Sequence, residues 1–226
     1  MQESGWWVDR AGHTLHHGSS VFSCDREIEA FAAWKEHALL LSSDTDCLSL
    51  WDRDGLVRLT RVGVYPQDMA IAGDMAIICG GADCCLHLLG LPDLLPCGDI
   101  SLPGMPERIA LQDGTAHVLT LLTEPEIHTR LICIELPTGI TSTRLTLTGI
   151  PGAIATDADG LWLGVSGQVL HLAFGATQPD IVVEGIEMPE HIDMYPDGII
   201  VTDALSSRSI WVRRDPDSRK GALTLR

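Results

Sequence analysis

The chain has 226 residues, with 15 Lys and Arg against 31 Asp and Glu, so its formal net charge is −16. This length allows one large all-β domain or two small ones with a substantial core. The negative charge argues against nucleic acid or an acidic membrane as a partner, because both require clustered cations.

The N-terminal residues contain neither a basic nor a long apolar segment, so we expect no signal peptide. The apolar runs elsewhere are far shorter than a membrane span. Seven cysteines form no C-x-x-C pair, and such an odd, scattered set is typical of reduced thiols packed as small apolar side chains. No Lys or Arg adjoins Cys84 and Cys85, so an activated thiol is not predicted there. These features together predict a cytoplasmic protein.

Residues 1–27 precede the first repeat. Residues 8–12 read Val-Asp-Arg-Ala-Gly and are similar to Trp-Asp-Arg-Asp-Gly at 51–55, a predicted turn between outer strands. We therefore expect two outer strands here that close a ring by pairing with the last blade, because closure removes exposed strand edges. The alternative is an exposed pair of strands that recruits a second copy of the protein. Strand alternation separates His16 from His17, so a zinc site with His13 is not predicted.

A short pattern built around a proline recurs through the rest of the chain. Its copies are Tyr65–Ile71, Met105–Leu111, Ile150–Thr156 and Met188–Met194, with a fainter copy at Ile28–Ala33. The anchor positions 28, 66, 106, 151 and 189 are 38, 40, 45 and 38 residues apart. A period of this length indicates a repeat architecture. We expect a single domain over residues 1–226, with repeats that start near these five positions.

Each repeat contains short apolar stretches separated by turn residues, which predicts strands. In the second repeat the predicted strands are Asp68–Ala72, Met75–Cys79, Cys85–Leu89 and Cys97–Leu102, with a tight turn at Gly73-Asp74. Residues 27–37 align with this repeat and are predicted as strand and turn. The fold class is thus all-β, a β-propeller of about five four-stranded blades with an extra partial blade. Its buried core should include Met69, Ile109, Ile154 and Ile192.

The last repeat carries a resemblance to a known family. Residues 199–203, Ile-Ile-Val-Thr-Asp, and 206–212, Ser-Ser-Arg-Ser-Ile-Trp-Val, resemble the second strand, loop and third strand of YVTN-type repeat propellers. That family includes lactonase-like and surface-layer members. The chain departs from the family at Cys79-Gly80 and Gly164-Val165, where the family has Thr-Asn. The resemblance implies the propeller fold and permits a lactonase-like activity.

The residues around each anchor proline should lie near one mouth of a propeller channel. They differ from repeat to repeat, which an asymmetric ligand pocket requires; the alternative is exposed loop residues whose identities have drifted. The predicted ligand-binding residues are Tyr65, Asp68, Glu107, Arg108, Glu190 and His191.

No nucleophile elbow, phosphate loop or dinucleotide fingerprint is present, so no catalytic residue and no cofactor are predicted. We expect a non-enzymatic recognition or scaffold protein, monomeric or homodimeric, that binds a protein or a small molecule. The alternative is a lactonase-like or other metal-assisted hydrolase. In that case the mouth carboxylates and His191 would hold a divalent cation.

Overall fold

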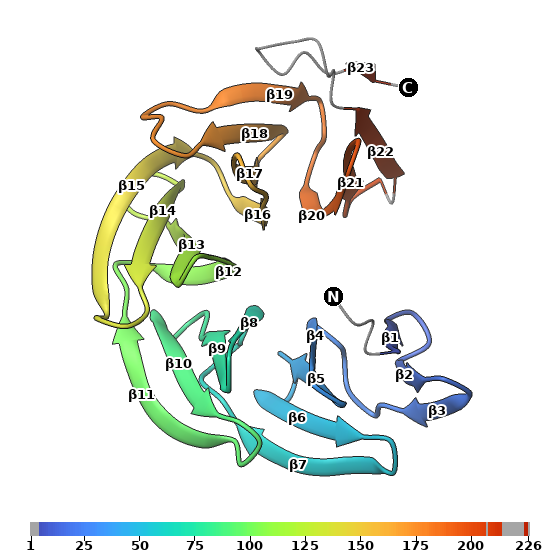
Figure 1. Ribbon diagram of the computed structural model, residues 1–226. Helices are drawn as coiled ribbons and strands as arrows, with labels where there is room; N and C mark the ends of the chain where they lie inside the picture. The colour runs from blue at the N-terminus through green and yellow to red at the C-terminus, as the bar shows by residue number, and fades with distance from the viewer. Residues whose placement is uncertain (1–4, 207, 214–223, 226) are drawn as a thin grey trace. The chain divides into compact units, whose positions relative to one another are not determined.

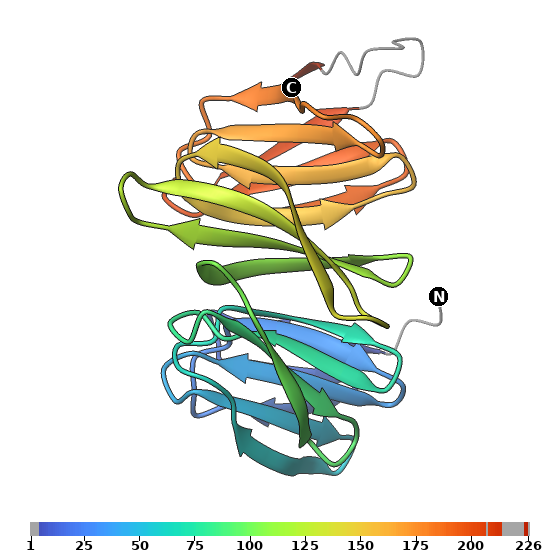
Figure 2. The same cartoon turned by 90° about the vertical axis from the view of Figure 1, so that its left-hand side faces the viewer.

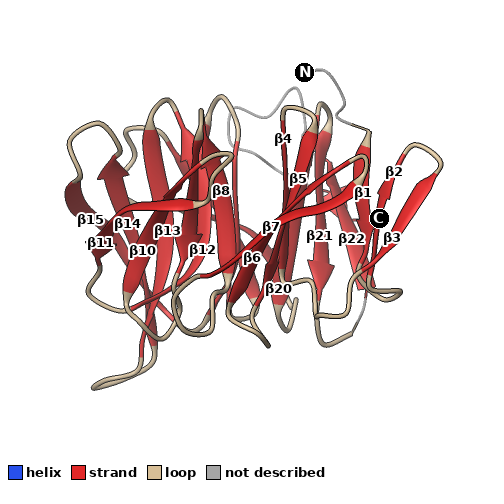
Figure 3. Ribbon diagram, turned by 90° about the horizontal axis from the view of Figure 1, so that it is seen from below, coloured by secondary structure: helices blue, strands red, loops and turns tan. Residues whose placement is uncertain are grey.

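The computed structural model describes residues 5–206, 208–213 and 224–225. These residues form strands joined by turns and loops (Figure 3), and none of them forms a helix that could cross a membrane. The strands make up six sheets, one with three strands and five with four. The chain divides into two compact units, Met1–Ile109 and Ala110–Arg226.

The first unit contains the first three sheets (Figure 1). The N-terminal sheet consists of β1 (Trp6–Asp9), β2 (Thr14–His17) and β3 (Ser20–Ser23). The second sheet consists of β4 (Ala30–Trp34), β5 (His37–Ser42), β6 (Cys47–Asp52) and β7 (Gly55–Arg61). The third consists of β8 (Asp68–Ala72), β9 (Met75–Cys79), β10 (Cys85–Gly90) and β11 (Leu95–Ser101). In each sheet the strands pair antiparallel in chain order.

The boundary between the units falls within β12 (Met105–Gln112), the first strand of the fourth sheet. That sheet continues with β13 (Thr115–Leu122), β14 (His128–Glu135) and β15 (Ile140–Thr148). The fifth sheet consists of β16 (Pro151–Thr156), β17 (Gly160–Val165), β18 (Gln168–Ala173) and β19 (Asp180–Glu184). The sixth consists of β20 (Pro189–Tyr195), β21 (Gly198–Asp203), β22 (Arg208–Arg213) and β23 (Thr224–Leu225).

Turn and anchor residues explain where these strands begin and end. The four anchor prolines are buried, and each lies close to the beginning of the first strand of its sheet: Pro66 before β8, Pro106 as the second residue of β12, and Pro151 and Pro189 as the first residues of β16 and β20. Proline has no N–H to donate to a ladder, so the start of a strand is where it is tolerated. The predicted turn between β8 and β9 is present, and Gly73 adopts a φ of 60° that few other residues accept. The strands of the second repeat agree with their predicted positions within a few residues.

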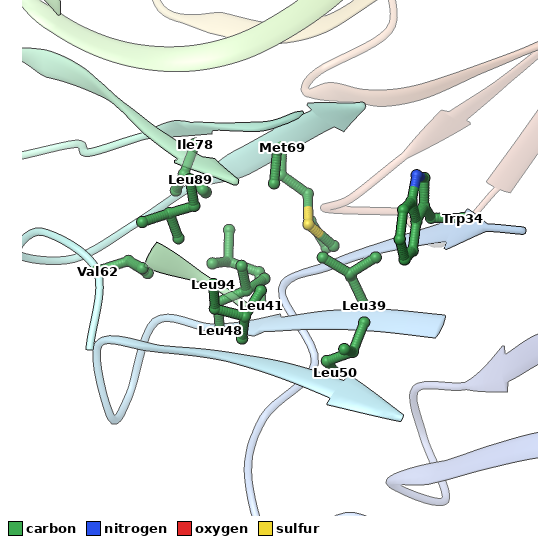
Figure 4. Close-up of a cluster of buried hydrophobic side chains, with 12 residues drawn as sticks. Trp34, Leu39, Leu41, Leu48, Leu50, Val62, Met69, Ile78, Leu89 and Leu94 are labelled. Carbon is green, nitrogen blue, oxygen red and sulfur yellow. The ribbon is translucent and has the colours of Figure 1, made fainter. Parts of the chain in front are cut away.

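Apolar side chains lie between neighbouring sheets of the same unit. In the first unit, Leu39, Leu48 and Leu50 from the second sheet cluster with Met69 and Ile78 from the third (Figure 4). Figure 2 shows the strands of these sheets in side view. Two clusters in the second unit join the fourth sheet to the fifth and the fifth to the sixth.

The four predicted core residues are not equally buried. Met69 and Ile109 are each 6% exposed. Ile154 and Ile192 are only partly buried and pack against their clusters from the side. The core prediction is therefore confirmed for the first two residues and only in part for the other two.

The N-terminal strands differ from the prediction in number and in partner. Three strands, not two, pair with one another in a separate sheet, and the fourth strand of the last sheet is β23. The count is therefore six sheets rather than about five and a partial blade. The reason is local packing, since Trp6, Leu15 and Cys24 cluster with Leu40 of the neighbouring sheet and with Ile28, which lies just before it.

The N-terminal histidines lie on opposite faces of this sheet. His17 stacks on Trp6 and His16 on Trp7, with ring centroids 4.3 and 3.6 Å apart. The sequence also predicts an outer strand of the last repeat at residues 221–226, of which only Thr224 and Leu225 belong to the described residues.

Candidate functional site

Four of the six predicted binding residues belong to the first unit, and two belong to the second. Asp68 begins β8, while Glu107 and Arg108 lie near the start of β12. Glu29, which stands at the same repeat position as Glu107, directly precedes β4. We call Glu29, Asp68, Glu107 and Arg108 the charged cluster. It contains three carboxylates and one guanidinium, all on partly buried residues.

Asp68 links two neighbouring first strands. Its Oδ1 accepts a hydrogen bond from the backbone N–H of Met69 at 2.8 Å, and its Oδ2 accepts one from the backbone N–H of Ile109 at 2.9 Å. Burial raises the pKa of Asp68 to about 6, although Arg108 and the two backbone N–H groups act in the opposite direction. Both carboxylate oxygens thus accept hydrogen bonds from the backbone, and through them Asp68 connects β8 to β12.

Glu107 is acted on by charges of both signs. Burial raises its pKa, Arg108 lowers it, and the negative charge of Glu29 raises it again. Arg108 donates a hydrogen bond to the backbone carbonyl of Glu107 at 2.8 Å. Glu29 accepts a hydrogen bond from Ser43 Oγ at 3.2 Å. The negative charge of Glu29 thus opposes part of the stabilisation that Arg108 gives to the Glu107 carboxylate, and a further positively charged group would stabilise both carboxylates.

Tyr65 lies in the loop before β8 with 60% of its surface exposed. Its backbone takes a φ of 55°, and its N–H donates to Asp46 Oδ1 at 2.8 Å. The backbone is thereby held in place while the ring points to solvent. Tyr65 can supply an exposed aromatic contact, but its hydrogen bond joins it to Asp46 and not to the charged cluster.

Glu190 and His191 lie at the start of β20 in the second unit, and both are partly buried. The pairing of β20 with β21 shifts register between Pro189 and His191, so Glu190 occupies a bulge. At the matching position of β16 stands Gly152, also at a register shift. A side chain on Gly152 would meet the carbonyl oxygen of Pro189. Packing therefore explains why a glycine, and not a charged residue, stands at this position of the repeat.

A second group of side chains was missed in the sequence. Asp83, Cys85 and His87 bring their ligand atoms within 4.8 Å of one another, the only such group among the described residues. His87 Nε2 lies 3.2 Å from Asp83 Oδ2 and 3.5 Å from Cys85 Sγ. His87 Nδ1 lies 2.8 Å from Asp99 Oδ1. We call these four residues the Cys-His-Asp cluster.

The backbone explains how these side chains meet. Cys85 and His87 are two residues apart on β10, so they share a face of the sheet, and Asp83 lies in the preceding loop. Asp99 on β11 is the register partner of His87. The spacing Asp-x-Cys-x-His is a signal that the sequence contains, since alternate residues on a strand face the same way. Asp99 becomes recognisable only once β10 and β11 are paired.

Three of these residues resemble a catalytic triad, because Asp99, His87 and Cys85 lie in the order carboxylate, imidazole, thiol. Burial, together with the charges of Asp99 and Asp83, raises the pKa of Cys85 to about 11. A nucleophilic cysteine needs a lowered pKa and a positive neighbourhood. This cluster therefore does not present an activated thiol. None of the seven cysteines forms a disulfide.

Comparisons with known proteins support the fold and no specific activity. No protein-family model matches the chain, and no curated protein matches it. Solved structures do match. Kuenenia stuttgartiensis hydrazine synthase aligns with 92% of this chain and 72% of its own, with 12% identity and a TM-score of 0.74. A functionally unknown protein from Desulfotomaculum acetoxidans aligns with 98% and 78%, with 11% identity and a TM-score of 0.71.

A chain in a nidogen/laminin complex aligns with 86% of this chain and 79% of its own, with 11% identity and a TM-score of 0.72. At these identities the likeness concerns the fold alone. Together with the succession of four-stranded antiparallel sheets, it defines the protein as a β-propeller. The matches do not extend to a YVTN family model, so membership of that family stays a prediction.

Proposed function

We propose that this protein is a non-enzymatic recognition propeller that binds a positively charged group of a protein or ligand at Glu29 and Glu107. The observation that supports it is the effect of Glu29 on Glu107, whose pKa is raised by burial and by this neighbouring carboxylate. A cationic group placed between the two would replace repulsion by attraction. Such charge complementarity favours specific and fast association.

The other members of the charged cluster hold this pair in place. Asp68 fixes β8 against β12 through its two backbone hydrogen bonds. Arg108 compensates part of the negative charge of Asp68 and Glu107. The net charge of −16 adds a long-range attraction for a basic partner.

The test is affinity capture from a cell extract with the wild type, Glu107→Gln and the matched control Glu126→Gln. Glu126 is exposed in the second unit. We expect proteins that the wild type and the control retain and that Glu107→Gln loses at least tenfold, with capture decreasing as salt is raised. If all three proteins capture the same set equally, the charged cluster is not the recognition site.

Metal-assisted hydrolysis remains the alternative that the YVTN resemblance permits. It predicts a stoichiometric divalent cation that depends on Glu190 and is lost on Glu190→Ala. Recognition of a cationic group predicts no effect of Glu190→Ala on metal content. Elemental analysis of the purified wild type and variant separates the two functions.

A further inference from the structure

We propose that Asp83, Cys85 and His87 bind a divalent transition-metal ion of the zinc class, and that Asp99 orients His87 for this purpose. The distances between their ligand atoms are close to the distances between the ligand atoms of a bound zinc ion. Zinc lies about 2.0–2.2 Å from nitrogen or oxygen and about 2.3 Å from sulfur. In a tetrahedral site this separates nitrogen from oxygen by about 3.3 Å and nitrogen from sulfur by about 3.6 Å. The observed separations are 3.2 and 3.5 Å.

The hydrogen bond to Asp99 directs a lone pair of His87 toward the other two ligands. His87 Nδ1 lies 2.8 Å from Asp99 Oδ1; when Nδ1 carries the proton and donates it to Asp99, Nε2 is the unprotonated nitrogen of the neutral ring. Nε2 then faces Asp83 Oδ2, a second acceptor, across 3.2 Å. Two acceptors at that distance lack a positive group between them. A carboxylate on the far nitrogen of a metal-binding histidine is the usual arrangement at metal sites.

The fold leaves room for the imidazole by placing two glycines against it. A Cβ on Gly63 would lie 2.5 Å from His87 Nε2, and one on Gly80 would lie 2.6 Å from it. Neither position could therefore carry a side chain while His87 keeps this orientation. Gly80 directly follows β9 and Gly63 follows β7, so two separate loops shape the site.

The donor set selects the class of metal. Thiolate and imidazole ligands suit zinc and related transition metals, whereas calcium and magnesium prefer oxygen ligands alone. Three protein ligands leave a fourth position for water. The side chains of His87 and Asp83 are 17% and 31% exposed, so an ion and a water molecule can reach the site from solvent.

The same side chains have one competing arrangement without a metal. If His87 carried protons on both nitrogens, it would form ion pairs with Asp83 and Asp99 together. In that arrangement Cys85 would be a packed thiol with no ligand role. The metal titration distinguishes the two arrangements, because only the metal site requires the sulfur.

The experiment uses the full chain without an affinity tag, stripped of metal with a chelator under reducing conditions. Cobalt(II) is added first, because a cobalt–thiolate bond produces a charge-transfer absorption in the near ultraviolet, and zinc is then used to displace it. We expect one cobalt per chain with this absorption. Cys85→Ser should abolish the absorption, and His87→Ala should weaken cobalt and zinc binding at least about 100-fold. Asp99→Asn should weaken binding about 10–100-fold while the absorption remains.

Cys84→Ser and Cys97→Ser are the matched controls, since they remove neighbouring thiols that lie outside the cluster. Both should bind cobalt and zinc within about twofold of the wild type. Circular dichroism of each variant shows whether it is folded. The proposal is overturned if the wild type shows no stoichiometric thiolate–cobalt absorption, or if Cys85→Ser binds as well as the controls. Loss of binding on Glu190→Ala with no effect of Cys85→Ser would place the ion at the predicted mouth instead.

Discussion

Asp68 offers the most direct test of the electrostatics of the first unit. Its pKa is about 6 in the folded protein, against an ordinary value of 3.8. Between these two values the folded chain keeps a proton that the unfolded chain has released. The folded state is therefore stabilised at low pH, and this stability decreases as the pH rises through the interval. The full difference of about two pKa units corresponds to about 3 kcal/mol.

The perturbation is Asp68→Asn, which removes the titration and keeps the shape of the side chain. Asparagine has one acceptor oxygen for the backbone N–H groups of Met69 and Ile109, so one hydrogen bond is lost at every pH. That cost is about 1–3 kcal/mol and does not depend on pH. The stability advantage of the wild type over the variant should therefore shrink by about 2 kcal/mol between pH 4 and pH 7.

Urea unfolding of both proteins at several pH values measures this difference in the free energy of unfolding. Titrating groups that the two proteins share contribute equally to both free energies, so their contributions cancel in the difference. A carboxyl carbon NMR titration of the wild type should give a midpoint near the value of about 6. A stability difference that stays constant from pH 4 to pH 7 would refute the assignment of Asp68 as a buried, destabilised carboxylate. A midpoint near 3.8 would lead to the same conclusion.

Two further predictions concern the core. Met69→Ala should reduce the free energy of unfolding by about 2–5 kcal/mol, because Met69 lies within the cluster between the second and third sheets. The control is Leu95→Ala, at a residue that is 63% exposed. In the same urea assay this control should change the free energy of unfolding little. Burial, with a smaller effect of Arg144, lowers the pKa of His117 from 6.5 to about 4. As the pH falls through this interval, the unfolded chain binds a proton that the folded chain does not bind. The free energy of unfolding should therefore decrease by about 3 kcal/mol in all. His117→Gln should lack this loss, and an equal acid sensitivity in both proteins would contradict it.

The two proposed sites can fail independently. The charged cluster is tested by partner capture and salt dependence, whereas the Cys-His-Asp cluster is tested by cobalt spectroscopy. Cys85→Ser should retain the partners of the wild type, and Glu107→Gln should retain the cobalt absorption. A variant that lost both properties would indicate damage to the first unit as a whole, which circular dichroism would reveal.

The sequence by itself determined the secondary structure and much of the repeat pattern. Turn glycines and strand-starting prolines act over a few residues, so Gly73 and Pro66 mark the limits of β8 without reference to distant parts of the chain. The alignment of the repeats likewise predicted Met69 as core. Asp68, Glu107 and Arg108 could be selected because they follow the same anchor in successive repeats.

Only the tertiary structure decided what those residues contact. Asp68 connects β8 to β12 because it accepts a hydrogen bond from the N–H of Ile109, which is 41 residues away in the chain. The partner of His87 is settled by the register of β10 and β11, which sets Asp99 opposite it. The N-terminal strands form a separate sheet, and their apolar side chains pack against those of the first repeat. Strand pairing and face-to-face packing depend on contacts between distant residues, so local patterns in the sequence do not specify them.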